Sequence, residues 1–136
     1  VRIDNESALK ISKKLDAKSF IWHNKYSHNE QEKIVNDLYK KSLIIVSDRL
    51  HALILAYSRG ALPINLLTIN KRKIQHHFDV IGIKKVNYII NEDTKVDFLL
   101  KEVEKMVDER EFYLERLLLA KERLQNLKEE VKLSLN

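Results

Sequence analysis

Short apolar runs alternate with amphipathic stretches along the first two-thirds of the chain, and this alternation is the strongest constraint on its fold. Runs rich in β-branched and aromatic residues are typical of strands, whereas apolar residues three or four positions apart are typical of helices. The clearest run is apolar at every position, as expected for a parallel strand covered on both faces. Strands are predicted at Ser19–His23, Leu43–Val46, Leu62–Leu67 and Asn87–Ile90.

Helix signals lie between these runs. Ser27 and Glu30 have the spacing of a capping box, in which a hydroxyl and a carboxylate exchange hydrogen bonds with the first helical turn, so a helix is predicted to begin there. Gly60 and Gly82 follow two further amphipathic stretches and are predicted to end their helices. The remaining expected elements are an extended segment at 1–3 and helices at 7–15, 49–59 and 73–81.

Strands that alternate with helices over short connections favour a parallel sheet, because parallel neighbours need a crossover. The predicted fold class is therefore α/β, with an open, mostly parallel sheet and helices on both faces. We expect this α/β domain to span residues 1–93.

From Thr94 to the end the pattern changes to one long amphipathic helix without Gly or Pro. Its apolar residues alternate in steps of three and four, and Arg110 is the only charged residue among them. About 40 residues at about 1.5 Å each would extend about 60 Å, which exceeds the width of a small domain. Either this helix, residues 94–136, bends, or its far half packs on a missing domain or on a second copy. The repeating positions are Val96, Leu99, Val103, Met106, Arg110, Tyr113, Leu117, Ala120, Leu124, Leu127 and Val131.

The charge balance favours an anionic ligand. The 136 residues carry a net charge of +5, and the excess lies in residues 1–93, where 16 basic residues stand against 10 acidic ones. The clusters Lys71-Arg72-Lys73 and Lys84-Lys85 suit a small phosphate better than a nucleic acid, because no basic and aromatic residues interleave. Without a leader pattern, a long apolar run or cysteine, a cytoplasmic protein is expected, with attachment to the inner membrane face as an alternative.

The junction from Leu43 to Ala52 is the best candidate site. A buried strand runs directly into a helix, and Ser47 and Asp48 are both suitable N-cap residues. Arg49 and His51 fall in the first turn, where an anion would meet backbone amides, the positive end of the helix dipole and two cationic side chains. The carboxyl end of a parallel strand is also where open α/β sheets bind ligands. Alternatively, Arg49 pairs with Asp48 and His51 belongs to the core.

The same residues carry a resemblance to a known family. Ser47-Asp48-Arg49-Leu50-His51-Ala52, followed by Gly60-x-x-Pro63-Ile64, by Asn70 and Lys73, and by Ile81-Gly82-Ile83, resembles the C-terminal half of the polysaccharide pyruvyl transferases. The opening Arg2-Ile3-Asp4-Asn5-Glu6 is similar to a segment before that half-domain in some members. The match covers about forty residues.

The resemblance implies one half of a glycosyltransferase-B-like enzyme that transfers pyruvyl from phosphoenolpyruvate to two sugar hydroxyls as a ketal. Arg49, His51 and the amide of Leu50 would bind the anionic donor, with Lys73 and Arg2 as secondary candidates. His51 would assist phosphate departure. Asp48 or Asp4 would be the base, and Asp48 is equally suited to a cap.

The resemblance further implies an acceptor that is a saccharide or a lipid-linked oligosaccharide, and it implies no metal or cofactor. Because the family's N-terminal half is absent, the chain alone is expected to be inactive. Two alternatives stay open: a nucleotide-sugar-binding half of a glycosyltransferase, and a non-catalytic interaction module that uses the heptad helix. His76, His77 and Asp79 are interpreted as surface residues, since adjacent helical side chains point about 100° apart.

Overall fold

The computed structural model describes residues 2–21, 25–67 and 72–134, and for residues 2–4 and 72 it describes the backbone only. The chain divides into two compact units, residues 1–35 and residues 36–136. No helix among the described residues is long and apolar enough to cross a bilayer.

The first unit is helical. Helix α1 spans Arg2–Leu15, so the helix predicted at 7–15 is confirmed. Residues 2–3, predicted to be extended, are helical, and residue 1 of that prediction lies outside the described residues. Ser19–Ile21 form no strand, and residues 22–24 of that predicted strand lie outside the described residues. A strand needs a neighbour for its backbone hydrogen bonds, and the described part of this unit contains none.

Helix α2, His28–Lys41, begins as predicted. The Ser27 backbone N–H donates to Glu30 Oε2 at 2.7 Å, and the Glu30 N–H donates to Ser27 Oγ at 3.3 Å. These two bonds are the capping box. The Ser27 N–H and the Ser27 hydroxyl, at 2.8 Å, both donate to Glu30 Oε2, and they hold the pKa of the Glu30 carboxyl below its ordinary value because these donors favour the ionised form.

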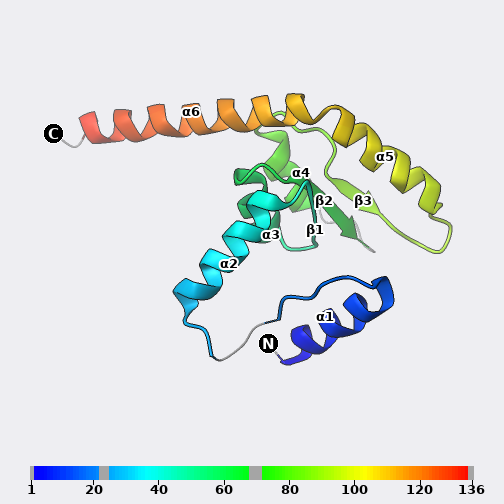
Figure 1. Ribbon diagram of the computed structural model, residues 1–136. Helices are drawn as coiled ribbons and strands as arrows, with labels where there is room; N and C mark the ends of the chain where they lie inside the picture. The colour runs from blue at the N-terminus through cyan, green and yellow to red at the C-terminus, as the bar shows by residue number, and fades with distance from the viewer. Residues whose placement is uncertain (1, 22–24, 68–71, 135–136) are drawn as a thin grey trace. The chain divides into compact units, whose positions relative to one another are not determined.

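The second unit is built on a three-stranded parallel sheet (Figure 1). Strands β1 (Ile44–Val46), β2 (Leu62–Leu67) and β3 (Asn87–Ile89) lie in that order, with Ile45 opposite Pro63 and Leu66 opposite Tyr88. The connections are helices α3 (Leu50–Ser58) and α4 (Arg72–Asp79). The open parallel sheet is therefore confirmed, and the described residues form three of the four predicted strands.

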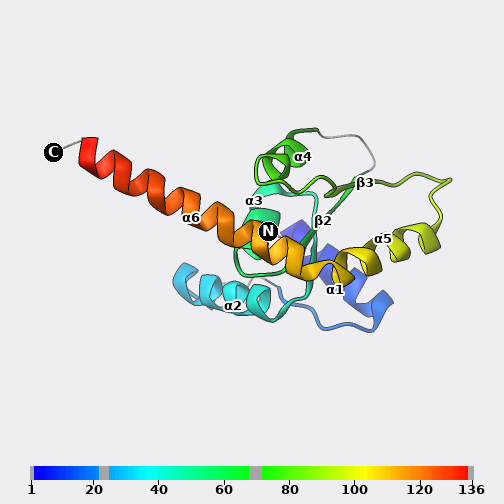
Figure 2. The same ribbon diagram turned by 90° about the horizontal axis from the view of Figure 1, so that it is seen from above.

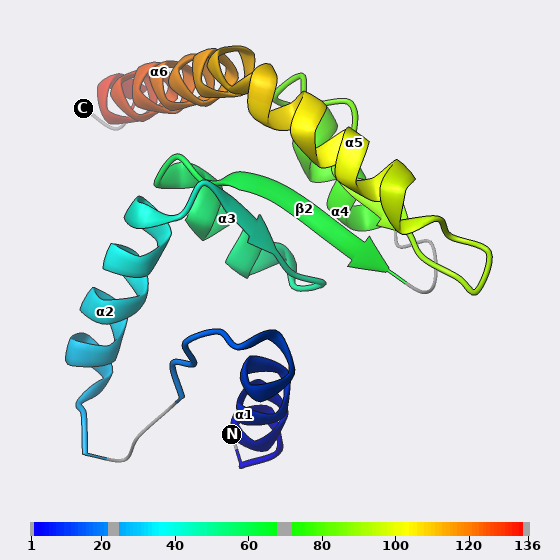
Figure 3. The same ribbon diagram turned by 45° about the vertical axis from the view of Figure 1, so that its right-hand side comes forward.

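Helices cover both faces of this sheet. The rings of Tyr57 in α3 and Phe78 in α4 meet edge to face at 5.8 Å between centroids, so these two helices are neighbours. Helix α5 (Val96–Asp108) lies across the sheet from α4 in Figure 2 and from α3 in Figure 3. The buried core joins all these layers and comprises Leu53, Tyr57, Leu62, Ile64, Ile74, Phe78, Ile83, Val86, Tyr88, Met106, Tyr113 and Leu117.

The two glycines end their helices as predicted. Gly60 follows α3 with φ +95°, and Gly82 follows α4 with φ +82°. Both angles lie in the left-handed region that glycine enters without a Cβ clash. Gly60 lets the chain turn back from α3 into β2, and Gly82 lets it turn back from α4 toward β3.

The long C-terminal helix predicted as one element is two. Helix α5 ends at Asp108, and helix α6 spans Arg110–Ser134. Glu109 separates them with φ −87° and ψ 17°, and Arg110, the charged residue of the apolar pattern, stands exposed at this break. The break lets α5 and the first turns of α6 follow the core, where Met106, Tyr113 and Leu117 are buried.

Contacts around α5 hold it to the sheet. Lys85 forms an ion pair with Glu102 of α5, and its ammonium lies 5.2 Å from the ring centre of Tyr88 and 5.5 Å from that of Phe98. Burial, with a smaller contribution from the Glu102 charge, raises the pKa of Tyr88 to about 12. The next helix, α6, is held by a separate contact, in which the Tyr57 hydroxyl of α3 donates to the Tyr113 carbonyl of α6.

Candidate functional site

The candidate site begins where β1 leaves the sheet. The Ser47 N–H donates to the Ile64 carbonyl at 3.0 Å, so the ladder continues one residue beyond β1. The Arg49 N–H then donates to Ser47 Oγ at 3.1 Å, which closes a tight turn. Helix α3 starts directly after this turn, at Leu50. The start of α3 therefore lies at the carboxyl edge of the parallel sheet, where folds of this kind bind ligands.

The residue that caps α3 differs from the prediction. Ser47 and Asp48 were predicted caps, but the N-cap is Arg49, with extended backbone (φ −104°, ψ 116°). The Ser47 hydroxyl is engaged by the turn and therefore does not cap the helix. Within the described part of the chain, no side-chain hydrogen bond caps α3, and its first turn holds no acidic residue. The positive end of this helix is therefore available to an external anion.

The side chains of residues 48–51 differ in their exposure to solvent. Leu50 is half-buried and packs against the core. Asp48, Arg49 and His51 are all exposed. His51 is thus not a core residue, which removes one of the two non-functional interpretations. An exposed guanidinium and an exposed imidazole beside an uncapped helix start form a surface suited to a carboxylate or a phosphate.

Lys73 lies on the same edge of the sheet. It is exposed in the first turn of α4, the helix that follows β2. Because β1 and β2 are parallel neighbours, their carboxyl ends share one edge, and the starts of α3 and α4 do too. Asn70, the other residue of the motif in this region, lies outside the described residues.

Arg2, and Asp4 as a candidate base, belong to a different unit from the other candidate residues. Both belong to α1 in the first unit, whereas the Asp48–His51 turn belongs to the second. The side chains of both residues lie outside the described part of the structure. Their assignment to the site therefore stays a prediction.

An asparagine pair that connects β2 to β3 was missed by the sequence reasoning. Asn65 is completely buried, and its Nδ2 donates to Oδ1 of Asn87 on the next strand at 2.6 Å. Among the described residues, Asn65 Oδ1 has no hydrogen-bond partner. A polar residue inside the otherwise apolar run Leu62–Leu67 was the available signal, since buried polar side chains seldom occur without a partner.

Gln75 of α4 was also missed, and it connects three segments. Its Oε1 accepts from the N–H groups of Val86, at 2.8 Å, and Asn87, at 3.2 Å. Its Nε2 donates to the Asp79 carboxylate at 3.0 Å and to the Ile83 carbonyl at 3.1 Å. One side chain thereby fixes the path from α4 into β3.

The metal interpretation of this helix finds no supporting geometry. His76 and His77 are exposed, and Asp79 accepts the hydrogen bond from Gln75. Across residues 2–21, 25–67 and 72–134, no three His, Cys, Asp or Glu side chains gather to hold an ion.

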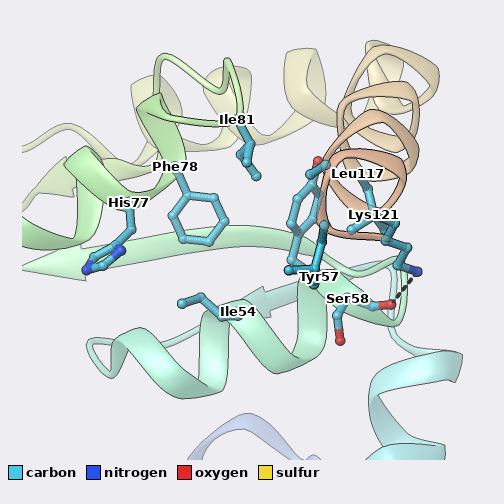
Figure 4. Close-up of a pocket in the computed structure, with 10 residues that line it drawn as sticks. Ile54, Tyr57, Ser58, His77, Phe78, Ile81, Leu117 and Lys121 are labelled. Atoms are coloured by element: carbon cyan, nitrogen blue, oxygen red, sulfur yellow. Dashed lines mark hydrogen bonds between the residues drawn. The ribbon is translucent and has the colours of Figure 1, made fainter. Parts of the chain in front are cut away.

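An apolar groove of about 300 Å³ lies between the ends of α3 and α4 and the side of α6 (Figure 4). Figure 4 shows Ile54, Phe78, Ile81 and Leu117 converging on it, while the Lys121 ammonium donates to the Ser58 carbonyl at its rim at 3.1 Å. The groove adjoins the last turns of α3 and α4, whereas the Asp48–His51 turn and Lys73 adjoin their first turns. It is therefore separate from the candidate anion site.

Comparison of the chain with models of protein families, with curated proteins and with solved structures finds no match in any of the three. The functional argument therefore depends on the residues at the carboxyl edge and on the motif that they form.

Proposed function

We propose that this chain is the phosphoenolpyruvate-binding half of a polysaccharide pyruvyl transferase, and that Asp48–His51 and Lys73 form its donor site. One observation carries the proposal: the uncapped start of α3, at the carboxyl edge of a parallel sheet, holds exposed Arg49 and His51 and no acidic residue in its first turn. Phosphoenolpyruvate is a small ligand with a carboxylate and a phosphate, and this surface offers donors for both.

Each residue has a defined task in the proposal. The planar guanidinium of Arg49 donates two parallel hydrogen bonds to the carboxylate or phosphate, and the Leu50 amide adds a third donor. Lys73 adds positive charge from α4. His51 donates a proton to the leaving phosphate or places a positive charge beside it. Asp48, exposed in the same turn, accepts a proton from the attacking hydroxyl.

The proposed pyruvyl transfer requires an acceptor that supplies two hydroxyl groups. One sugar hydroxyl adds to the carbon that bears the phosphate while the methylene carbon gains a proton. A second hydroxyl then displaces inorganic phosphate and closes the cyclic ketal, so all atoms of both substrates are accounted for. The acceptor is a saccharide or a lipid-linked oligosaccharide of cell-surface polysaccharide synthesis, bound by a further half-domain. The chain by itself binds the donor without turning it over.

Calorimetric titration of phosphoenolpyruvate into the chain tests this proposal. We expect binding to the unaltered chain and to Arg123→Ala, which removes one exposed cation from α6. We expect Arg49→Ala to weaken binding roughly tenfold or more, because a charge-assisted hydrogen bond contributes about 1.5–3 kcal/mol. Inorganic phosphate should bind more weakly than phosphoenolpyruvate, since it lacks the carboxylate.

Equal weakening by Arg49→Ala and Arg123→Ala would contradict a defined site and indicate general attraction to a basic surface. Binding of a nucleotide sugar, with no binding of phosphoenolpyruvate, would replace the proposal by the glycosyltransferase alternative.

A further inference from the structure

A pocket of about 190 Å³ lies between the segment that leads into β3, the end of α5 and the start of α6. Its lining includes Gly82 and Lys84, which precede β3, so the pocket adjoins the amino edge of the sheet. The Asp48–His51 turn lies at the opposite, carboxyl edge, because all three strands are parallel. This pocket is therefore separate from the proposed donor site.

Two tyrosines that line this pocket are almost completely buried. Tyr88 is 5% exposed and Tyr113 is 7% exposed. Within residues 2–21, 25–67 and 72–134, neither phenol hydroxyl takes part in a hydrogen bond. In the same ranges, the fully sealed side-chain atoms without a partner are Gln31 Oε1 and Asn65 Oδ1, so both phenol oxygens are accessible to a small molecule. Because a buried tyrosine O–H usually has a partner, these two donors point to a ligand.

Both phenols are protonated at neutral pH. Burial raises the pKa of Tyr88 to about 12, and burial also raises the pKa of Tyr113. The negative charge of the Glu102 carboxylate contributes to both of these pKa shifts, so the two phenols lie within reach of the same carboxylate. Each hydroxyl therefore keeps its proton and can donate it to an acceptor.

The charged side chains of the pocket leave Lys84 without a partner among the residues that the structure describes. Lys85 forms an ion pair with Glu102, and Lys105 forms one with Glu109 at 3.9 Å. These pairs involve both carboxylates of the lining, so neither carboxylate is left to attract a cationic ligand. A molecule in the pocket meets two phenol donors and one uncompensated positive charge, and this combination selects an anion.

Part of the pocket is apolar, which limits the kind of anion. Met106 of α5 is 2% exposed, and the ring of Phe112 meets that of Tyr113 edge to face at 5.6 Å between centroids. The volume holds about six non-hydrogen atoms, if each takes about 30 Å³, the share of one water molecule in the liquid. The pocket therefore suits a small molecule with one anionic end and one short apolar end.

We propose that this pocket binds a small organic carboxylate of about six non-hydrogen atoms. The carboxylate accepts hydrogen bonds from the hydroxyls of Tyr88 and Tyr113, and Lys84 supplies the positive charge. The apolar end lies against Met106 and Phe112. Inorganic phosphate lacks such an end, and an alkylammonium ion would add a second positive charge beside the lysine. The proposal goes beyond pyruvyl transfer and does not rest on it.

Titration of the chain with butanoate, a carboxylate of this size, tests the proposal, with binding followed by NMR chemical shifts. We expect saturable binding that Tyr88→Phe and Tyr113→Phe each weaken roughly tenfold, because each change removes a donor to a charged acceptor and keeps the ring. The matched control is Tyr39→Phe, the same change at a tyrosine of α2 outside the pocket. A natural chain that does not bind butanoate, or equal weakening by all three changes, would overturn the proposal.

The charge of the ligand provides an independent readout. Lys84→Gln should weaken butanoate binding, whereas Lys128→Gln, which removes an exposed lysine from α6, should leave it unchanged. Butylammonium has a similar apolar end and the opposite charge, so it should not bind, and inorganic phosphate should bind more weakly than butanoate. Equal affinity for butanoate and butylammonium would refute the assignment, because the pocket would then recognise only the apolar end.

The same titration separates this pocket from the proposed donor site. Arg49→Ala should leave butanoate binding unchanged, and Tyr88→Phe should leave phosphoenolpyruvate binding unchanged, since the two sites adjoin opposite edges of the sheet. Loss of butanoate binding in Arg49→Ala would assign the carboxylate to the donor site and contradict the pocket. The two proposals can therefore fail separately.

Discussion

A single glutamine does much to define the path of the second unit. Gln75 donates or accepts four hydrogen bonds, to Asp79, Ile83, Val86 and Asn87, and so links α4, the segment after it and β3. Backbone N–H groups in a partly buried position need an acceptor, and the Gln75 side chain is the acceptor for two of them, those of Val86 and Asn87.

Replacing Gln75 with leucine should therefore lower the free energy of unfolding by about 2 kcal/mol, the usual cost of leaving a buried donor unpaired. Urea denaturation followed by circular dichroism measures the change. Gln125→Leu is the matched control, because Gln125 is exposed on α6 and bonds only to Glu129 among the contacts described, at 2.9 Å. An equal loss in both variants would mean that the four bonds of Gln75 contribute nothing specific.

Glu30 predicts a pH dependence at the start of α2. The Ser27 amide and hydroxyl hold its folded pKa below the ordinary value, so the ionised carboxylate adds stability at neutral pH. That contribution is lost as the pH falls through the folded pKa, because the proton then occupies the acceptor. The melting temperature of Glu30→Gln should lie slightly below that of the natural chain at neutral pH and converge with it at low pH. Glu32→Gln, with the same charge change two residues on, should lack this convergence.

An interaction between single residues could be predicted from the sequence when its two partners lie close together along the chain. The Ser27–Glu30 capping box could be predicted because its two residues are three positions apart and the geometry of a first turn is nearly constant. The Asn65–Asn87 bond and the bonds of Gln75 could not, since their partners are brought together only when the strands pair. The Ser47 hydroxyl was predicted to cap α3, but its oxygen accepts from the Arg49 N–H in the turn before the helix. A turn and a helix cap can compete for the same side-chain oxygen, and the sequence alone does not decide between them.

Among the elements, the helix ends depend on glycine. Gly60 has φ +95°, and a Cβ built there would meet only Leu114 Cδ2, at an ordinary 3.8 Å. The cost of Gly60→Ala is thus backbone strain, about 1 kcal/mol, rather than a clash. Gly60→Asn should cost less, because asparagine enters the left-handed region more readily. Urea denaturation of the two variants should give this order, and the reverse order would show that side-chain packing dominates at this turn.

Elements were predictable where their own pattern was enough to define them. Strands β1, β2 and β3 and helices α3 and α4 were anticipated within a few residues, because apolar runs and glycine signals act locally. The run at Ser19–His23 also contains apolar and aromatic residues, but its described part, Ser19–Ile21, has no neighbouring strand among the described residues of its unit. The break at Glu109 has no Gly or Pro signal, and it lies where the chain turns to keep Met106 and Tyr113 in the core.

For the whole molecule, the α/β class and the parallel order followed from alternation and short connections, which leave few alternative topologies. The same logic located the candidate site, because a parallel sheet places the ends of β1 and β2 on one edge whatever the details of the turn. The side-chain arrangement of that edge depends on Leu50 packing into the core, which only the assembled structure reveals.

Gln75 also determines how the sheet can grow. Strand β3 stands at the border of the sheet, and exposed strand borders are where protein chains add to one another in aggregates. The Asn87 N–H points away from β2, and it already donates to the carboxamide oxygen of Gln75. A strand that joined β3 at this residue would first have to displace that bond. The hydrogen bonds that direct the chain into β3 therefore also occupy a donor on the side of the strand where another chain would pair.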